Sequence, residues 1–237
     1  MLELIIPLAD EARAYIIPMS ADKYDLENLQ DQNQRDMVRN LAVVLGGAVR
    51  ATMELHTVYE DIVTCYRMAR RYPWRGSKIK RSQHLQFVWV QFINQCYLFR
   101  EKYKLATNQL NRCSKVYDQT ATPLGPGLRE IDKRLGKYIR ARGQHFHEWF
   151  EHNTHVQYFS MIELINSVKR SDGPMGNVEG HYRDAKMMLG WDIEAAGESV
   201  EAILRGAVHG QIGDLVKMLK KFNGLVGRLE KRAKRSP

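Results

Sequence analysis

The feature that most constrains the fold is a helical pattern of apolar residues near the middle of the chain. Between about residues 80 and 117, apolar side chains recur at steps of four and three, at Leu85, Trp89, Phe92, Cys96, Phe99, Tyr103, Ala106 and Leu110. Such steps align side chains on one face of an α-helix, whereas a half-buried strand needs alternation at every second residue. The pattern therefore predicts one long helix whose apolar face belongs to the core of a helical bundle.

Helical periodicity also fills most of the rest of the chain. We expect further helices at about residues 26–72, 128–152, 155–170 and 178–235. The first of them is either one long helix or two collinear ones, and Gly46 and Gly47 mark the place of a possible kink or break, because glycine weakens a helix interior. Proline- and glycine-rich stretches separate the others, at "RRYPWRGSK", "DQTATPLGPG" (residues 118–127) and "SDGPMGN" (residues 171–177). The sequence thus predicts an all-α fold, a helical bundle of about five helices with a basic C-terminal helical arm.

The length of 237 residues suits one domain with an appended arm. We expect residues 1–20 to be an N-terminal lead-in, residues 21–172 to form the bundle, and residues 173–237 to form C-terminal helices that pack on it and end in a basic tail. The apolar fraction of 44% is enough for a core and excludes wholesale disorder. The large aromatic residues Trp89, Phe92 and Phe99 serve either this core or a dimer contact.

Charge, cysteine usage and apolar runs indicate where the chain works and what it contacts. Its net charge of +9 favours polyanionic partners such as RNA, DNA or an anionic membrane. The three cysteines form no CxxC pair, which argues against a disulfide framework and indicates a reducing compartment. The N-terminus lacks the basic lead of a secretory signal, and no run of 18 apolar residues exists. We therefore expect a cytoplasmic protein without a membrane span.

The stretch "RARGQHFHEWFEH", residues 140–152, concentrates arginine and histidine on a predicted helix. At about 100° per residue, one side of this helix carries an apolar stripe, formed by Ile131, Leu135, Tyr138, Phe146 and Trp149. Arg142 and His145 fall on the side of the stripe, whereas Arg140 and His147 fall on the opposite face, two turns apart. Two Arg–His pairs are therefore expected, one inward and one outward, and Gly143 could bend the helix and bring them together.

An arginine and a histidine together suffice for metal-free RNA cleavage. A histidine exchanges protons near neutral pH and can act as general base or acid on the ribose 2′-hydroxyl or the leaving oxygen. An arginine keeps its charge and can stabilise the extra charge on phosphorus through two donors. The alternative is that His145 packs in the core while Arg140 and His147 are solvated.

A metal site is the less favoured interpretation of the same stretch. "HEWFEH" misses the HExxH zinc pattern, because Glu151 occupies the place four residues after His147, and the histidine follows at His152. His152 and His155 could pair, but no cysteine or acidic cluster completes the set. No GxxxxGK loop occurs either. We expect no metal, no cofactor and no nucleoside triphosphate hydrolysis.

The arrangement resembles the HEPN (higher eukaryotes and prokaryotes nucleotide-binding) superfamily, whose members are all-α bundles with an arginine, four to six residues and a histidine. Arg140-x4-His145, Arg142-x4-His147 and Arg140-x6-His147 all have this spacing. The helix "FVWVQFINQCYLFREKYKLATNQLN" is similar to the long helix before the motif, and the resemblance covers roughly residues 35–165. It implies a homodimeric, metal-independent RNase of the toxin–antitoxin or antiphage type, with a possible antitoxin or other protein partner. It equally permits members that only bind RNA or nucleotides.

The C-terminal helix offers a second basic surface for RNA. Its cations are Lys217, Lys220, Lys221, Arg228, Lys231, Arg232, Lys234 and Arg235. The leading hypothesis is an HEPN-like protein that acts on RNA, with Arg140, Arg142, His145 and His147 as candidate catalytic residues and the outward pair of Arg140 and His147 favoured. The alternatives are a non-catalytic RNA-binding or protein-interaction module and a peripheral membrane-surface binder that uses the amphipathic C-terminal helix.

Overall fold

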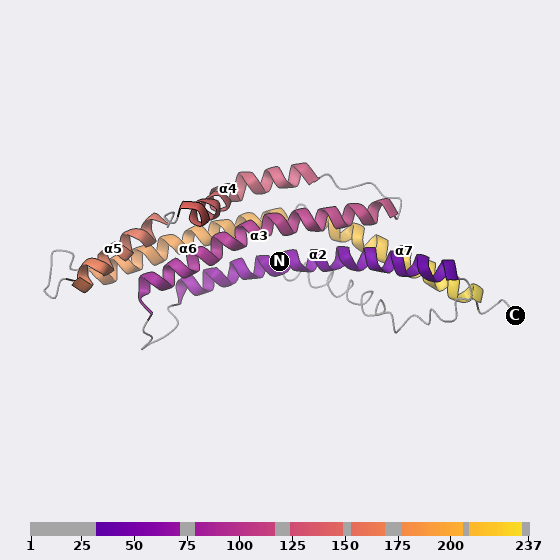
Figure 1. Cartoon of the computed structure of the whole chain (residues 1–237), viewed down its shortest axis with the longest axis horizontal. Helices are drawn as coiled ribbons and strands as arrows, with labels where there is room; N and C mark the ends of the chain where they lie inside the picture. Colours follow the sequence, from indigo (N-terminus) through magenta and orange to yellow (C-terminus); the bar gives the residue numbers. More distant parts are fainter. Residues whose placement is uncertain are drawn as a thin grey trace. The chain divides into compact units, whose positions relative to one another are not determined.

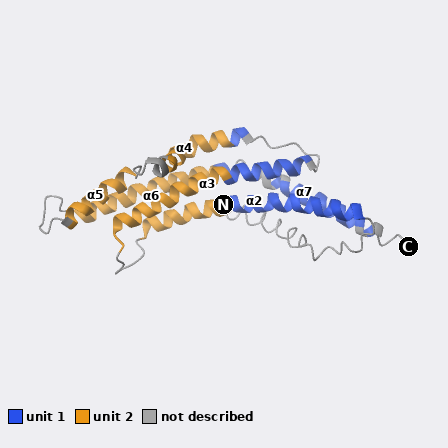
Figure 2. Cartoon of the chain, viewed as in Figure 1, with its two compact units in different colours: residues 1–55, 102–127, 203–237 blue, residues 56–101, 128–202 orange. Residues whose placement is uncertain are grey.

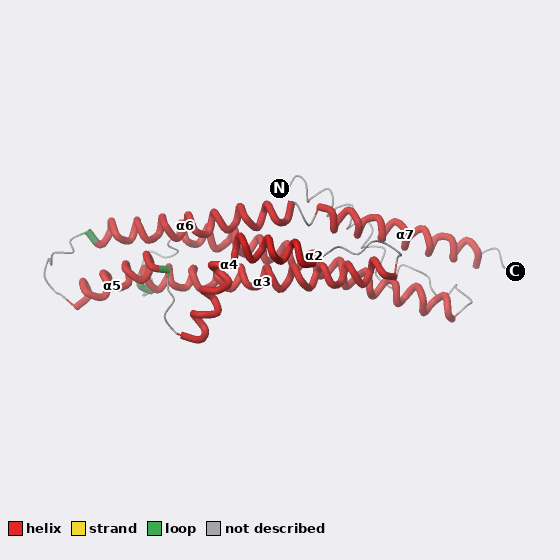
Figure 3. The backbone as a smooth tube through the Cα atoms, turned by 90° about the horizontal axis from the view of Figure 1, so that it is seen from above, coloured by secondary structure: helices red, strands yellow, loops and turns green. Residues whose placement is uncertain are grey.

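In the computed structural model, the chain is described at residues 32–71, 79–116, 124–148, 153–168, 177–205 and 209–233. Every regular element in these ranges is helical (Figures 1 and 3). The six helices are α2 (Gln32–Arg70), α3 (Arg81–Val116), α4 (Leu124–Glu148), α5 (Thr154–Val168), α6 (Val178–Ile203) and α7 (His209–Ala233). The all-α prediction is confirmed. The described part has six helices rather than about five, because the span expected at residues 178–235 is divided into α6 and α7.

Of the two alternatives for residues 26–72, the structure has the one long helix, because α2 runs from Gln32 to Arg70 across Gly46 and Gly47. One local expectation was wrong. The loop expected at residues 118–127 is already helical from Leu124, while residues 117–123 lie outside the described part. Pro126 is tolerated there because it lies in the first turn of α4, where a backbone N–H has no acceptor within the helix. The break expected at residues 171–177 also lies outside the described part, except for Asn177.

The chain divides into two compact units (Figure 2). Unit 1 comprises Met1–Leu55, Lys102–Gly127 and Ile203–Pro237, and unit 2 comprises His56–Glu101 and Leu128–Ala202. This division follows other boundaries than residues 20 and 172, which the sequence suggested. Unit 2 contains the segment with the arginine–histidine pattern, and unit 1 contains the basic C-terminal helix.

The core of unit 1 is built from α2, α3 and α7. Its buried members are Val38, Leu45, Ala48, Val49, Leu110, Cys113, Leu215, Met218, Leu219, Phe222, Val226 and Leu229. The α7 members recur at helical spacing, so one face of α7 is committed to this core. An ion pair at 2.6 Å between Lys102 Nζ and Glu54 also joins α3 to α2 within the unit.

The apolar residues whose spacing predicted α3 belong to the cores of both units. All eight of these residues are buried, and five of them lie in unit 2. There Phe92 meets Tyr138 of α4 edge to face, with ring centroids 4.8 Å apart. Because Trp89, Phe92 and Phe99 are buried within a single chain, they belong to its own core. Each fully buried large apolar side chain contributes about 1.5–3 kcal/mol to folding.

The three cysteines form no disulfide with one another, as their spacing suggested. Cys65, Cys96 and Cys113 are free and buried, and burial raises the pKa of each thiol.

In the described part of the chain, α2 is long and apolar enough, by length and composition alone, to cross a membrane. Core helices of soluble proteins pass the same test. Leu45, Leu55 and Ile62 of α2 are fully buried.

Candidate functional site

The arginines of the RARGQHFH segment lie on different sides of α4, as the helical periodicity predicted. Arg140 is exposed. Arg142 is half-buried, and its guanidinium lies 4.1 Å from the ring centroid of Tyr97 on α3. A cation over an aromatic face is a stabilising packing contact. Arg142 is therefore part of the α3–α4 packing, whereas Arg140 faces solvent.

For the histidines of this segment, the structure describes the backbone alone. His145 and His147 belong to the helical backbone of α4, but their side chains lie outside the described part of the structure. The same holds for Phe146 of the predicted apolar stripe, and Trp149 lies outside it altogether. The remaining stripe residues Ile131, Leu135 and Tyr138 are buried as expected. The Arg–His pairing itself stays a prediction.

A polar cluster around Asp192 holds α4 in place on α6. The Tyr138 hydroxyl donates to the Asp192 backbone carbonyl at 2.9 Å, and Lys137 Nζ contacts Asp192 Oδ1 at 3.2 Å. Asn153 donates to Asp192 Oδ2 at 3.0 Å, and its own Oδ1 accepts from the backbone N–H of His155 at 3.1 Å, which caps the start of α5. Burial raises the pKa of Tyr138 to about 12, so its hydroxyl keeps its proton near neutral pH. The cluster thus fixes the turn of α4 that precedes Arg142.

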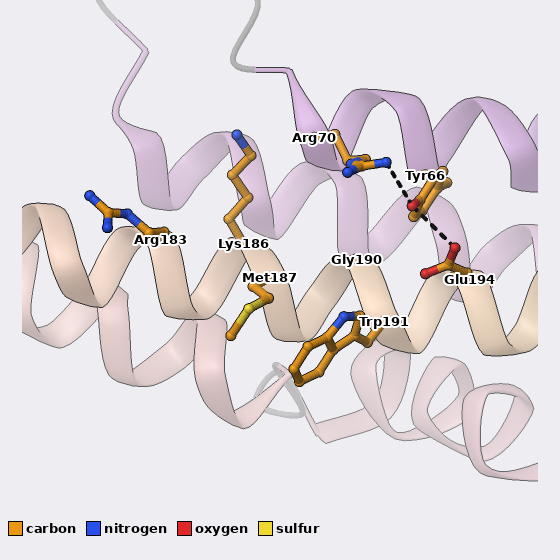
Figure 4. Close-up of a pocket in the computed structure, with 8 residues that line it drawn as sticks. All are labelled: Tyr66, Arg70, Arg183, Lys186, Met187, Gly190, Trp191 and Glu194. Carbon is orange, nitrogen blue, oxygen red and sulfur yellow. Dashed lines mark hydrogen bonds between the residues drawn. The ribbon is translucent and has the colours of Figure 1, made fainter.

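A cavity of about 570 Å³ in unit 2 lies between α2 and α6 (Figure 4). Its lining residues are Tyr66, Arg70, Arg183, Lys186, Met187, Gly190, Trp191 and Glu194. Cavities that hold small ligands commonly measure about 300–1,000 Å³. Three cations and one carboxylate line this cavity, which leaves a surplus of two positive charges.

The cavity wall on α6 follows from residue spacing. Its six α6 residues, from Arg183 to Glu194, recur at steps of three and one, which places them on one helix face. The neighbouring face carries the buried residues Leu189, Ile193 and Ala196. Gly190 occupies the middle of the wall, and a Cβ added there would meet no atom within 4 Å. The absence of a side chain at Gly190 therefore leaves the middle of the cavity open.

The aromatic and charged groups of the cavity have distinct surroundings. Trp191 is 55% exposed, so its indole is not a core residue. Arg70 Nη1 donates to the Tyr66 hydroxyl at 3.0 Å, and that hydroxyl donates to Glu194 Oε1 at 3.3 Å (Figure 4). Arg183 and Lys186 lie toward the other end of the same face (Figure 4). A phosphate-bearing ligand would meet cations along the cavity and an exposed aromatic face beside them.

Arg81 is a further cation that contacts α6, but the carboxylate of Glu179 neutralises its charge. Arg81 forms an ion pair with Glu179 and lies over the Tyr182 ring, 4.7 Å from its centroid. The hydrogen bond from Arg81 lowers the pKa of Glu179 and keeps it ionised. The positive surplus of the cavity therefore comes from Arg70, Arg183 and Lys186.

Sequence reasoning missed this cavity, although a signal was present. "YRMAR" at residues 66–70 and "YRDAKMMLGW" at residues 182–191 combine basic and aromatic residues at helical spacing. Neither motif shows which helices pair. The contact between the Tyr66 hydroxyl and Glu194 joins residues more than a hundred positions apart, and local periodicity carries no such information.

The predicted basic surface of α7 is present in unit 1. Lys217, Lys220, Lys221, Arg228 and Lys231 are exposed, and their spacing places them on one face, opposite the buried apolar residues. The side chains of Arg232, Lys234 and Arg235 lie outside the described part. Among the described residues, no three His, Cys, Asp or Glu side chains are grouped so that they could hold a metal ion.

Comparison with protein-family models, with curated proteins and with solved structures finds no match to this chain.

Proposed function

We propose that the chain binds single-stranded RNA and that the cavity between α2 and α6 is its binding site. The observation that carries this proposal is that Arg70, Arg183, Lys186 and the exposed indole of Trp191 line one cavity. Cations neutralise phosphates and release counterions, and arginine binds phosphate through two donors. Exposed aromatic rings stack on unpaired bases, each worth about 1–3 kcal/mol.

Single strands suit this cavity better than a duplex or a lipid surface. Bases in an RNA duplex are stacked on one another and paired, so their faces are not free to stack on the Trp191 indole. The membrane alternative required the apolar face of α7, but Leu219, Phe222 and Val226 of that face are buried in the core of unit 1. An interfacial helix needs its apolar face free to enter the lipid. The structure thus supports RNA over a membrane surface as the polyanionic partner.

The binding test is a titration of a fluorescein-labelled single-stranded RNA followed by anisotropy. We expect saturable binding that weakens steeply between 50 and 200 mM salt, because phosphate contacts release counterions (a slope of about −0.7 in log affinity per contact for single strands). Saturable binding without salt dependence would contradict the assigned role of the three cations. No binding at 50 mM salt would refute the proposed function.

We further propose metal-independent cleavage of the bound RNA at the α4 segment, as the HEPN resemblance implies. Arg140 is the better arginine for this role because it is exposed, whereas Arg142 packs on Tyr97. In this reaction the ribose 2′-oxygen attacks phosphorus and the bond to the 5′-oxygen breaks. His147 takes the proton of the 2′-hydroxyl or supplies one to the leaving oxygen, and the other proton exchanges with water. The products are a 2′,3′-cyclic phosphate and a 5′-hydroxyl. A homodimer and a toxin or antiphage role belong to the same proposal.

Cleavage is tested with single substitutions on α4. Arg140→Ala and His147→Ala should each abolish cleavage in EDTA while the far-UV spectrum stays unchanged. Arg134→Ala is the matched control, because Arg134 is exposed on the same helix and forms an ion pair with Glu130 in the turn before it. Arg142→Ala should lower stability, since it removes the contact with Tyr97. If Arg142→Ala and His145→Ala abolish cleavage in folded protein, the inward pair is the site. If wild type is inert on RNA that it binds, the chain is a non-catalytic RNA-binding module.

A further inference from the structure

The cavity is lined by one carboxylate, which has no role in binding phosphate. Glu194 lines the cavity together with three cations, yet a carboxylate repels phosphate. We propose that Glu194 recognises a guanine base, which makes the cavity selective for guanine-containing RNA. This inference rests on the RNA-binding function proposed above and names the ligand that the same cavity prefers.

The surroundings of Glu194 orient its carboxylate without using its full capacity. Within the described part of the chain, its Oε1 accepts one hydrogen bond, from the Tyr66 hydroxyl at 3.3 Å. The Tyr66 hydroxyl is in turn held by Arg70 Nη1 at 3.0 Å. An ionised carboxylate offers about four acceptor positions on two oxygens. Glu194 is also exposed, so a ligand in the cavity can reach it.

Guanine matches a carboxylate better than the other RNA bases do. Its Watson–Crick edge presents two adjacent donors, the N1–H and the N2 amino group, which can meet the two carboxylate oxygens together. In cytosine and adenine, the single amino donor lies beside a ring nitrogen that accepts hydrogen bonds and would face the second carboxylate oxygen. In uracil, the N3–H lies between two carbonyl oxygens. Unpaired bases are read on this edge while their faces stack on aromatic side chains.

The order of residues along α6 fits a base at one end and phosphate at the other. Trp191 precedes Glu194 by three residues, so the two lie one turn apart on the same face. Lys186 lies eight residues before Glu194, about 12 Å along the helix axis. Gly190 lies between them (Figure 4), and a Cβ added there would meet no other side chain and no neighbouring helix within 4 Å. A guanine ring at Trp191 and Glu194 would therefore place its phosphates toward Lys186 and Arg183.

The test compares uridine heptamers that carry guanosine, adenosine, cytidine or uridine at the central position, by anisotropy on the full chain. Wild type should bind the guanosine oligomer about tenfold more tightly than the others, the discrimination expected of one bidentate base contact. Inosine, which lacks the N2 amino group, should be intermediate. 7-Deazaguanosine should bind like guanosine, because only its Hoogsteen edge is altered.

Glu194→Gln should remove the guanine preference while RNA binding persists, because an amide presents one donor and one acceptor where guanine needs two acceptors. Binding of the other oligomers should tighten, since a negative charge is lost. Glu198→Gln is the matched control, because Glu198 is exposed on the same helix and does not line the cavity. Equal wild-type affinity for all four oligomers, or a preference that survives in Glu194→Gln, would overturn the inference and leave RNA binding standing. Absence of all RNA binding would overturn the proposed function and the inference with it.

Discussion

Asp192 and Glu194 are two carboxylates on α6 with different surroundings. Residues two positions apart on a helix are rotated by about 200° about its axis, so the side chains of Asp192 and Glu194 lie on nearly opposite faces. Asp192 is half-buried and contacts Lys137, Tyr138 and Asn153. Glu194 is exposed, and within the described part of the chain its hydrogen-bond partner is Tyr66. The first carboxylate therefore stabilises the fold, and the second faces the cavity.

This difference predicts unequal effects on stability. Asp192→Ala should lower the free energy of unfolding by about 2 kcal/mol, because hydrogen bonds to a charged group contribute about 1.5–3 kcal/mol. Glu194→Ala should change it by less than about 0.5 kcal/mol, as is usual for an exposed position. Urea denaturation of the two variants beside wild type measures both. Equal losses would show that Asp192 does not join α4 and α5 to α6.

At the scale of elements, α7 combines a buried and a basic face. Leu215, Phe222 and Val226 are buried in unit 1, while Lys217 and Lys221 are exposed on the opposite side. Deleting α7 would therefore remove part of the core together with the charge. Substitution of exposed lysines is the cleaner way to test whether this helix contributes to RNA affinity.

A triple variant should bind every single-stranded RNA more weakly than wild type, and by a similar factor. It carries Lys217→Gln, Lys220→Gln and Lys221→Gln. Contacts to phosphate carry no base information, and each lost contact should reduce the salt slope by about 0.7. The guanine preference should stay as in wild type, because it is assigned to the cavity of unit 2. Anisotropy at several salt concentrations measures both quantities. An unchanged salt slope in a folded variant would exclude α7 from the RNA contact.

The helices were predictable from sequence because their determinants are local. The pattern from Leu85 to Leu110 predicted α3 to within a residue or two, since spacing of three and four requires no knowledge of partners. The start of α4 was misjudged because Pro126 looks like a helix breaker unless it lies in the first turn. For α2, the sequence left one long helix or two collinear ones open, and Gly46 and Gly47 do not divide it. Gly46 leaves open space around its missing Cβ, and the surrounding apolar residues are held by the core of unit 1.

At the scale of the whole molecule, the chain brings residues from distant segments into one site. The opposite sides of Arg140 and Arg142 followed from the periodicity of α4, which is a local property. The cavity could not be predicted in this way, because Tyr66 reaches Glu194, and Arg70 lines the same cavity as Arg183, only through the pairing of α2 with α6. Helix pairing depends on the packing of both surfaces, and a single sequence does not state it.

The central claim, that RNA occupies the cavity between α2 and α6, is tested most directly by filling that cavity. Gly190→Leu places a side chain in its middle without removing any charge, and a Cβ there meets no atom within 4 Å. Gly197→Leu is the matched control on the same helix, because its Cβ also meets open space and it does not line the cavity. Both should fold at least as well as wild type, since leucine favours helix over glycine. We expect Gly190→Leu to lower affinity for a guanosine-containing single strand at least tenfold in an anisotropy titration, while Gly197→Leu binds like wild type. Equal affinities of the two variants would contradict the account.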